Sequence, residues 1–196
     1  TLRLVALKTA PVYLMKKNPS SAKTPVRLFV FSCPTPWGDF YAVHSARGLV
    51  SLDFPGCPVR PRAENGTKAS AAVLARHKIL CRWLCRTLSG RRAALPRALR
   101  LDTRRLSPFV RRILGALASF PRGKTLSYAA LAEKCGGKHL VRAVARGCGA
   151  NPFPILIPCH RVIYSNGGLG GFSGGIQWKK RLLVLEKLCQ PGPQCI

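Results

Sequence analysis

Short apolar runs separated by turn-forming residues dominate the first part of the chain. Residues 26–32, 40–45 and 49–54 are apolar, and proline, glycine and small polar residues separate them. This pattern predicts a meander of three short antiparallel strands. Residues 69–88 instead carry apolar side chains at helical spacing, and Gly90 is a suitable stop, so a helix is predicted after the strands.

The second part of the chain has a helical period, which predicts a second domain of different character. A basic loop that contains a proline divides the two parts. We predict an N-terminal domain over residues 26–105 and a C-terminal domain over residues 106–190. The second domain opens with a helix over 109–119, for which Ser107 and Pro108 are a good N-cap and N1 pair. A poorly ordered basic arm is expected at 1–25 and a tail at 191–196. A small antiparallel sheet with helices, followed by a helical domain, is a mixed α/β (α+β) fold class.

Two more short helices are predicted in the second domain, joined by a glycine turn. Either Thr125 or Ser127 can cap a helix that runs to Cys135. Glycines at 136–137 turn the chain, and another helix covers residues 138–146. This arrangement matches a helix-turn-helix, although a simple helical hairpin has the same spacing.

The charge of the chain narrows the class of partner. The 196 residues include 33 Lys and Arg against 6 Asp and Glu, a formal net charge of +27 that is spread over both halves. Such an excess predicts a polyanionic partner, which is DNA, RNA or, less often, an anionic membrane surface. It argues against a cationic small substrate. The charge therefore favours a DNA-binding helix-turn-helix over the helical hairpin.

Cysteine usage and hydropathy bear on the compartment. The nine cysteines form no CxxC pair, and a chain with 47% hydrophobic residues can fold around a core without disulfides. We therefore expect reduced thiols in an intracellular protein, located in the nucleus of a eukaryote or in the cytoplasm and nucleoid of a prokaryote. No apolar run has the length of a membrane span, so no membrane association is expected; a weak organelle-targeting signal in the arm is the alternative.

A cysteine followed directly by a histidine lies in a proline-rich apolar segment, residues 151–162. Prolines restrict the backbone of this segment, and its apolar side chains would exclude water from Cys159. An imidazole at His160 and a guanidinium at Arg161 can lower a thiol pKa and supply a thiolate nucleophile. A buried structural cysteine would explain the same pair of residues without any chemistry.

This segment resembles the active-site motif of the O6-alkylguanine-DNA alkyltransferases, also called methylated-DNA–protein-cysteine methyltransferases. The Pro-Cys-His-Arg-Val core is intact at residues 158–162, after an Asn-Pro-x-Pro segment. The predicted helix-turn-helix before it and a Ser-Gly-Gly at 173–175 after it have the family's order and spacing. The resemblance extends from about Phe109 to Leu188 and, more weakly, back to residues 35–38.

The resemblance implies both a fold and a reaction. The N-terminal domain would be ribonuclease-H-like and the C-terminal domain winged-helix-like. The protein would flip O6-alkylguanine, and also O4-alkylthymine, out of duplex DNA and move the alkyl group irreversibly to Cys159. Because a thioether has no good leaving group, each molecule would act once. The implied partner is double-stranded DNA bearing alkylated guanine, bound through its minor groove by a monomer without a cofactor.

A second interpretation keeps the scaffold and removes the chemistry. The chain would then be a non-reactive protein that binds alkylated DNA or regulates its repair. Lineages that only bind the lesion lack the acceptor thiol, whereas Cys159 is present here. This difference favours the alkyltransferase.

The resemblance also assigns roles to single residues. Cys159 would accept the alkyl group, His160 would form its thiolate through a water, and Glu186 would orient His160. Tyr128 would donate a proton or hydrogen bond to the departing guanine, and Asn151 would form the hinge before the active-site segment. The residues implied to contact DNA share the predicted helix-turn-helix, where Arg142 would fill the gap left by the flipped base: Ser127, Tyr128, Arg142 and Ala143. The residues implied to form the base pocket lie on either side of the cysteine: Pro154, Phe172, Ser173 and Gly174.

Several positions depart from the family's pattern. Leu140, Val141 and Arg146 stand where the family usually has alanine or glycine, which bears on how closely a helix docks on DNA. Phe172 replaces a tyrosine, and Ile113 lies where an aromatic residue is common. These departures bear on DNA affinity and substrate range more than on the chemistry.

One further pattern has metal-ligand chemistry. His77, Cys81 and Cys85 follow one another at four-residue steps on one predicted helix. Some members of the resembled family hold a structural zinc in this domain, but a full set of four ligands is not evident from the spacing. Small cysteines on the core face of a helix explain the same pattern, so we expect no metal and no cofactor.

Overall fold

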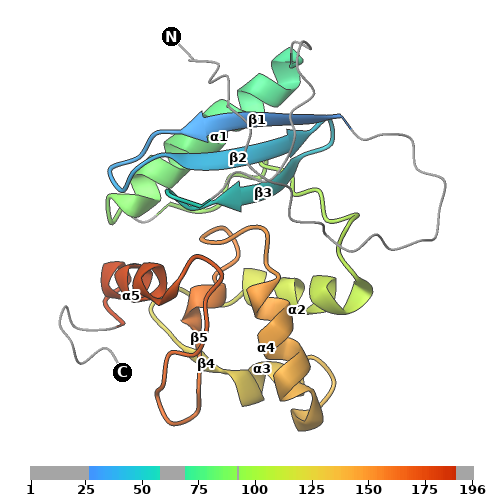
Figure 1. Ribbon diagram of the computed structural model, residues 1–196, viewed down its shortest axis with the longest axis vertical. Coiled ribbons are helices and arrows are strands. Elements are labelled where there is room, and N and C mark those ends of the chain that lie inside the picture. The colour runs from blue at the N-terminus through green and yellow to red at the C-terminus, as the bar shows by residue number, and fades with distance from the viewer. Residues whose placement is uncertain (1–26, 58–68, 92, 189–196) are drawn as a thin grey trace.

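The computed structural model describes residues 27–57, 69–91 and 93–188. A small sheet with one long helix forms one layer, and a cluster of shorter helices forms the other (Figure 1). This mixed α/β architecture confirms the predicted fold class. The arm predicted at 1–25 and the tail predicted at 191–196 lie outside the described residues, and the predicted domain boundaries stay a prediction.

The N-terminal layer is the predicted meander. Strands β1 (Leu28–Cys33), β2 (Phe40–Ser45) and β3 (Leu49–Asp53) pair antiparallel in the order β1-β2-β3. Helix α1 (Ala71–Leu88) packs along one side of this sheet (Figure 1). The hydroxyl of Ser70 accepts a hydrogen bond from the backbone N–H of the third helical residue, which is the usual reason for a helix to begin after serine.

Serine caps also set the starts of two helices in the C-terminal layer. Ser107 caps α2 (Pro108–Ala118), as the sequence predicted. Ser127 caps α3 (Tyr128–Lys134) by accepting a hydrogen bond from a backbone N–H, 3.0 Å away. Of the two candidate caps for this helix, the serine is therefore the correct one.

The turn after α3 differs from the prediction. Gly136 and Gly137 have φ values of 124° and 130°, a region that favours glycine. The next three residues form a 3₁₀ turn, η1 (Lys138–Leu140), and α4 covers Val141–Gly149. A single helix over 138–146 was therefore wrong at both ends. Neither η1 nor α4 has a side-chain cap, which removes the signal that would have placed the start correctly.

The sequence pattern did not predict the elements at and after the end of the proline-rich segment 151–162. The cysteine begins a 3₁₀ turn, η2 (Cys159–Arg161), which leads into β5 (Val162–Ile163). Strand β5 pairs in parallel with β4 (Leu126–Ser127). Helix α5 (Ile176–Leu185) then begins after Gly175 without a side-chain cap, so the chain offers little local signal for it.

The two layers are joined directly at the segment 151–162. The backbone N–H of Leu52 on β3 donates a hydrogen bond to the carbonyl of Pro152, 2.9 Å away. The ring of Trp178 on α5 lies 4.8 Å from that of Phe54 and 5.6 Å from that of Phe40, measured between centroids. The N-terminal layer therefore contacts the segment 151–162 through a backbone hydrogen bond and contacts α5 through aromatic rings.

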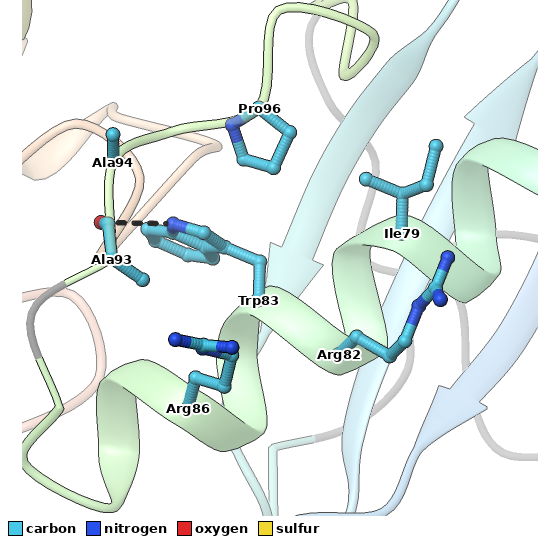
Figure 2. Close-up of a pocket in the computed structure, with 7 residues that line it drawn as sticks. All are labelled: Ile79, Arg82, Trp83, Arg86, Ala93, Ala94 and Pro96. Atoms are coloured by element: carbon cyan, nitrogen blue, oxygen red, sulfur yellow. Dashed lines mark hydrogen bonds between the residues drawn. The ribbon is translucent and has the colours of Figure 1, made fainter.

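A surface hollow of about 500 Å³ lies between α1 and the loop after it. The indole N–H of Trp83 donates a hydrogen bond to the carbonyl of Ala93, 3.2 Å away, and so ties this loop to the helix (Figure 2). Arg82 and Arg86 line the hollow, but no residue of the cysteine-histidine segment does. No helix in the described ranges is both long and apolar enough to span a bilayer.

Candidate active site

Asn151 organises the segment that carries the cysteine. Its side-chain carbonyl accepts a hydrogen bond from the N–H of Phe153, 2.9 Å away. Its amide nitrogen donates to the carbonyl of Ile157 at 3.0 Å and lies 3.1 Å from the sulfur of Cys159. One buried side chain therefore connects the start of the loop, its end and the sulfur of Cys159. The predicted Asn-Pro turn is therefore present. The contact between the Asn151 amide and the Cys159 sulfur was not predicted.

The backbone of this segment contains a strained residue. Ile155 has a φ of 71°, which is unfavourable for a β-branched side chain. The N–H of Ile157 donates to the carbonyl of Phe153 at 2.9 Å, which closes the turn around Ile155. Strain of this kind persists only where the surroundings impose it, and it is common at functional sites.

Cys159 lies inside the protein, with 3% of its surface exposed. Burial raises the pKa of this thiol, while the hydrogen bond from Asn151 and the charge of Lys179 oppose that shift. The resting side chain is therefore a protonated thiol at neutral pH. Its use as a nucleophile requires a base nearby.

His160 and Glu186 are brought together from segments 26 residues apart. The Nε2 atom of His160 lies 3.1 Å from the carboxylate of Glu186. Burial lowers the pKa of His160, against the opposing effect of the carboxylate, and so favours the neutral imidazole. Burial also acts to raise the pKa of Glu186, but hydrogen bonds from His160 and Arg161 outweigh it and lower that pKa to about 2.

These protonation states define the tautomer of His160. A carboxylate only accepts hydrogen bonds, so Nε2 of His160 carries the proton and Nδ1 carries the lone pair. Nδ1 is buried and has no hydrogen-bond partner within the described part of the chain. His160 thus has the arrangement of a general base that a carboxylate orients.

Arg161 has a role in the structure that the sequence did not predict. Two of its guanidinium nitrogens donate to the carboxylate of Glu186, at 2.8 and 2.9 Å, and a third donates to the carbonyl of Phe120 at 2.7 Å. Its position in the sequence suggested a cation beside the thiol. Its guanidinium instead holds the carboxylate that orients His160.

Lys179 is a second residue whose place near Cys159 the sequence did not predict. It is fully buried on α5, and its ammonium donates hydrogen bonds to the carbonyls of Val162 and Leu169. Burial lowers the pKa of Lys179 to about 8, against opposing effects of Cys159 and Cys148. Lys179 thereby holds the loop after β5 in place and brings a positive charge near the sulfur of Cys159. A Lys-Lys pair in a basic chain offers no signal for such a role.

Tyr128 is buried at the start of α3, with 4% of its surface exposed. Its ring centroid lies 5.2 Å from that of Tyr164, and a side chain added at Gly170 would meet its hydroxyl at 3.0 Å. Burial raises the pKa of Tyr128, so the phenol stays protonated and can donate a hydrogen bond. The structure places Tyr128 inward and not toward solvent.

The loop predicted to close the base pocket packs on the N-terminal layer. A Cβ added at Gly174 would lie 2.4 Å from the ring of Phe54, so only glycine fits there without a shift. The ring of Phe172 packs edge-on against Phe54 at 5.6 Å, and Ser173 is exposed. Pro154 is buried within the segment 151–162. The substrate roles of these residues stay predictions.

The predicted DNA-contacting residues differ in accessibility. Arg142 is exposed on α4, whereas Ala143 on the same helix is half-buried. The hydroxyl of Ser127 is engaged in capping α3. Their contacts with DNA also stay predictions.

The metal-ligand pattern on α1 does not form as the spacing suggested. The sulfur of Cys85 donates to the carbonyl of Pro34, 3.2 Å away. Cys33 from β1 takes its place beside His77 and Cys81. Because Cys33 lies on β1, the spacing of residues along α1 could not identify it as a neighbour of His77 and Cys81.

The C-terminal layer, which contains Cys159 and His160, is similar to known protein sequences. Residues 108–188 match the family model described as 6-O-methylguanine DNA methyltransferase, DNA binding domain. The methylated-DNA–protein-cysteine methyltransferase of Methanothermobacter thermautotrophicus is 45% identical over 92 residues, which are 47% of this chain and 51% of that protein. The chain spans about half the length of the curated relatives that it matches.

Comparison of structures covers more of the chain. The crystal structure of Mycobacterium tuberculosis OGT in complex with DNA has 30% sequence identity and a TM-score of 0.64, covering 80% of this chain and 91% of that one. The crystal structure of the Mycobacterium tuberculosis O6-methylguanine methyltransferase has 29% identity and a TM-score of 0.68, covering 85% and 96%. The similarity therefore includes the N-terminal layer as well as the matched domain.

Proposed function

Because the chain belongs to the 6-O-methylguanine DNA methyltransferase family, we propose that it repairs DNA by moving an alkyl group from guanine O6 to Cys159. One observation carries the proposal: Cys159, contacted by Asn151, is followed by a buried His160 that Glu186 orients. The chain thus contains an acceptor thiol and a base with its orienting carboxylate. Double-stranded DNA bearing alkylated guanine is the partner, and O4-alkylthymine is a second substrate.

The first chemical step is formation of the thiolate. Nδ1 of His160 takes the thiol proton of Cys159 through a bridging water, and the carboxylate of Glu186 stabilises the imidazolium that results. The amide of Asn151 and the ammonium of Lys179 stabilise the negative sulfur, because each presents a donor or a positive charge to it. The chemistry requires no cofactor.

The second step is displacement at the alkyl carbon. The Cys159 sulfur forms a bond to that carbon while the carbon–O6 bond breaks, and its electron pair passes to guanine. The protonated phenol of Tyr128 supplies a hydrogen bond or proton to the leaving base. The product is an S-alkylcysteine, which has no good leaving group. Each molecule therefore reacts once.

The alkylated base must leave the duplex before it reaches a buried sulfur. Flipping costs a few kcal/mol in lost stacking. We infer that Arg142, exposed on α4, enters the stack from the minor groove and offsets part of this cost. The +27 charge supplies a sequence-independent attraction to phosphate that suits a protein that scans DNA as a monomer.

Transfer of label tests the proposal directly. Duplex DNA carrying O6-[methyl-³H]guanine is mixed with excess protein, and radioactivity on the protein is measured. We expect about one methyl per active molecule on the wild type and none on Cys159→Ala. Cys148→Ala removes another buried thiol, on α4, and is expected to accept label normally.

The alternative is a protein that binds the lesion without reacting. It would retain alkylated duplex DNA in a binding assay while all label stays on the DNA. That result with folded wild-type protein would refute transfer. Label on Cys159→Ala would refute the assigned acceptor.

A further inference from the structure

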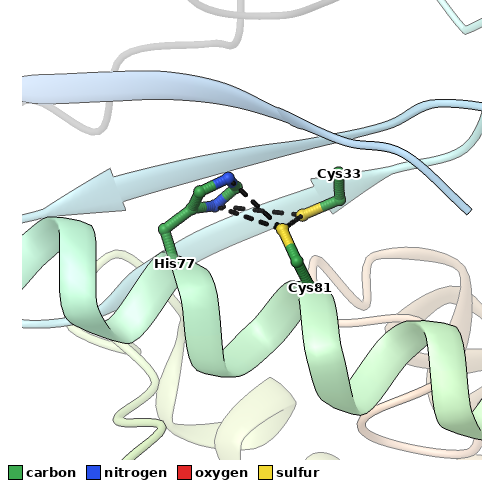
Figure 3. A group of neighbouring side chains, drawn as sticks. All are labelled: Cys33, His77 and Cys81. Carbon is green, nitrogen blue, oxygen red and sulfur yellow. Dashed lines mark hydrogen bonds between the residues drawn. The ribbon is translucent and has the colours of Figure 1, made fainter. Parts of the chain in front are cut away.

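Three side chains with metal-binding chemistry meet between the sheet and α1. Cys33 ends β1, and His77 and Cys81 lie one turn apart on the facing side of α1 (Figure 3). One ligand atom from each lies within 4.8 Å of the other two. The two sulfurs are 2.8 Å apart. None of these residues takes part in the proposed alkyl transfer.

The imidazole of His77 is oriented toward the sulfurs. Its Nε2 lies 3.2 Å from the carbonyl oxygen of Ser32, which can only accept, and 3.3 Å from the sulfur of Cys81. Nε2 therefore carries the proton, which leaves the lone pair on Nδ1, 3.8 Å from the sulfur of Cys33 and 4.0 Å from that of Cys81. Metal-binding histidines commonly donate their second ring N–H to a backbone carbonyl in this way.

Neighbouring rings hold that orientation. The ring of Phe31 stacks on His77 at 4.7 Å, and the ring of His44 meets it edge-on at 5.5 Å. Cys33 and His77 are buried, so rotation of either side chain is restricted by packing. Cys81 is half-buried and has more freedom to move.

We propose that Cys33, His77 and Cys81 bind Zn²⁺ as two thiolates and one neutral imidazole, with a fourth coordination position open toward solvent. Binding releases two thiol protons, and the resulting unit is electrically neutral. Two sulfurs and one imidazole nitrogen are ligands that zinc prefers in proteins. Neutrality favours placing such a unit in a largely buried position.

The distances fit this proposal after one small movement. Tetrahedral zinc with usual bond lengths sets its sulfur and nitrogen ligands about 3.6 Å apart and its two sulfurs about 3.8 Å apart. The Nδ1 distances of 3.8 and 4.0 Å are already close to that value. The sulfur of Cys81 lies 3.3 Å from Nε2 and so nearer to it than to Nδ1. It must therefore move toward the Nδ1 side of the ring and away from the sulfur of Cys33, by about 1 Å from their contact of 2.8 Å, which a rotation of Cys81 can supply.

A surface pocket provides access. It has a volume of about 410 Å³, and its lining residues come from the end of β1 and from α1: Ser32, Pro34, His77, Lys78, Cys81 and Arg82. A metal ion can therefore reach the sulfur of Cys81. A water or small anion can occupy the fourth position, which an open site of this type retains.

Cobalt binding gives a direct test. The reduced, metal-free 196-residue protein is titrated with Co²⁺, whose bonds to thiolate give a near-ultraviolet charge-transfer band, and Zn²⁺ is then added as a competitor. We expect one Co²⁺ per chain, displaced by Zn²⁺. Cys33→Ala and Cys81→Ala should each weaken binding by about 100-fold or more, since each removes a direct ligand.

Cys85→Ala is the matched control, because it removes a thiol one turn further along α1 that points to Pro34 instead. It should bind Co²⁺ like the wild type. Circular dichroism checks that each variant folds. A second measurement needs no variant: Zn²⁺ should slow the reaction of Cys81 with iodoacetamide and leave that of Cys57 unchanged.

Three outcomes would overturn the proposal. The first is reduced wild-type protein that gives no thiolate–cobalt band. The second is a band that Cys81→Ala retains, or one that Cys85→Ala loses. The third is a Cys33–Cys81 disulfide in the isolated protein together with no metal binding after its reduction, which would make the pair a redox couple instead.

Discussion

Replacing Glu186 with glutamine tests whether the carboxylate of Glu186 supports His160 as the base that forms the thiolate. Its side chain is 8% exposed and accepts hydrogen bonds from His160 and twice from Arg161. The substitution preserves the shape and removes the charge. The guanidinium of Arg161 then loses its only anionic partner among residues 27–57, 69–91 and 93–188, and the imidazolium formed during thiolate generation loses its counter-charge.

Both losses can be estimated. Hydrogen bonds to charged groups contribute about 1.5–3 kcal/mol, so alkyl transfer by Glu186→Gln should slow by about 10- to 100-fold. Breaking a buried pair by removing one partner costs up to about 3–5 kcal/mol of unfolding free energy, and the partial exposure of Arg161 reduces this to about 2–3 kcal/mol. Single-turnover transfer and urea unfolding at pH 7 measure the two effects.

The lowered pKa of Glu186 also predicts how the stability difference between wild type and Glu186→Gln depends on pH. The pKa of Glu186 is about 2 in the folded protein and 4.5 as its ordinary value. A lowered pKa contributes stability that is present above the ordinary value and is lost as the pH falls toward the folded value. The stability difference between wild type and Glu186→Gln should therefore be full at pH 7 and shrink between about pH 4.5 and pH 2.

Glu133→Gln is the control, because Glu133 is an exposed carboxylate on α3. It should leave transfer and stability unchanged within about 0.5 kcal/mol. If Glu186→Gln transfers alkyl groups at the wild-type rate, the carboxylate does not support the base. If the stability difference stays constant down to pH 3, the charge of Glu186 is not what stabilises the site.

Two further predictions concern DNA and the pocket loop. Arg142→Ala should slow transfer from duplex DNA by about 10-fold or more while changing the reaction with free O6-benzylguanine little, because only the duplex requires a base to be flipped; equal slowing of both would remove the intercalating role. Gly174→Ala should lower the unfolding free energy by about 1–3 kcal/mol, since the added methyl meets the ring of Phe54 at 2.4 Å. Gly171→Ala, which meets nothing within 4 Å, is the control for thermal unfolding, and an equal loss in both variants would contradict the packing argument.

Local patterns in the sequence predicted the elements that depend on local interactions. The three strands follow from apolar runs between turns, and α2 follows from the cap at Ser107. The segment 151–162 was predicted as the candidate site from its Pro-Cys-His-Arg-Val motif, because Cys159 and His160 are adjacent in sequence. Helix α5 lacks a capping side chain, so its start had no local signal.

The remaining features arise from contacts between distant segments. Arg161 and Glu186 are 25 residues apart, and no periodicity links them. Lys179 binds two carbonyls that only the folded loop brings together. Cys33 joins His77 across 44 residues, whereas helical spacing pointed to Cys85. Tertiary packing determines these pairs, and a single sequence carries no signal for them.

The hydrogen bond between Leu52 and Pro152 limits how the protein can be divided or recombined. The family model covers only residues 108–188, which suggests a self-contained module for engineering. Yet a transplanted module would leave the carbonyl of Pro152 without its donor and the ring of Trp178 without the aromatic surface of Phe40 and Phe54. A chimera that exchanges the N-terminal layer must therefore reproduce an edge strand and two aromatic rings at those positions. The two halves are consequently expected to vary as a pair.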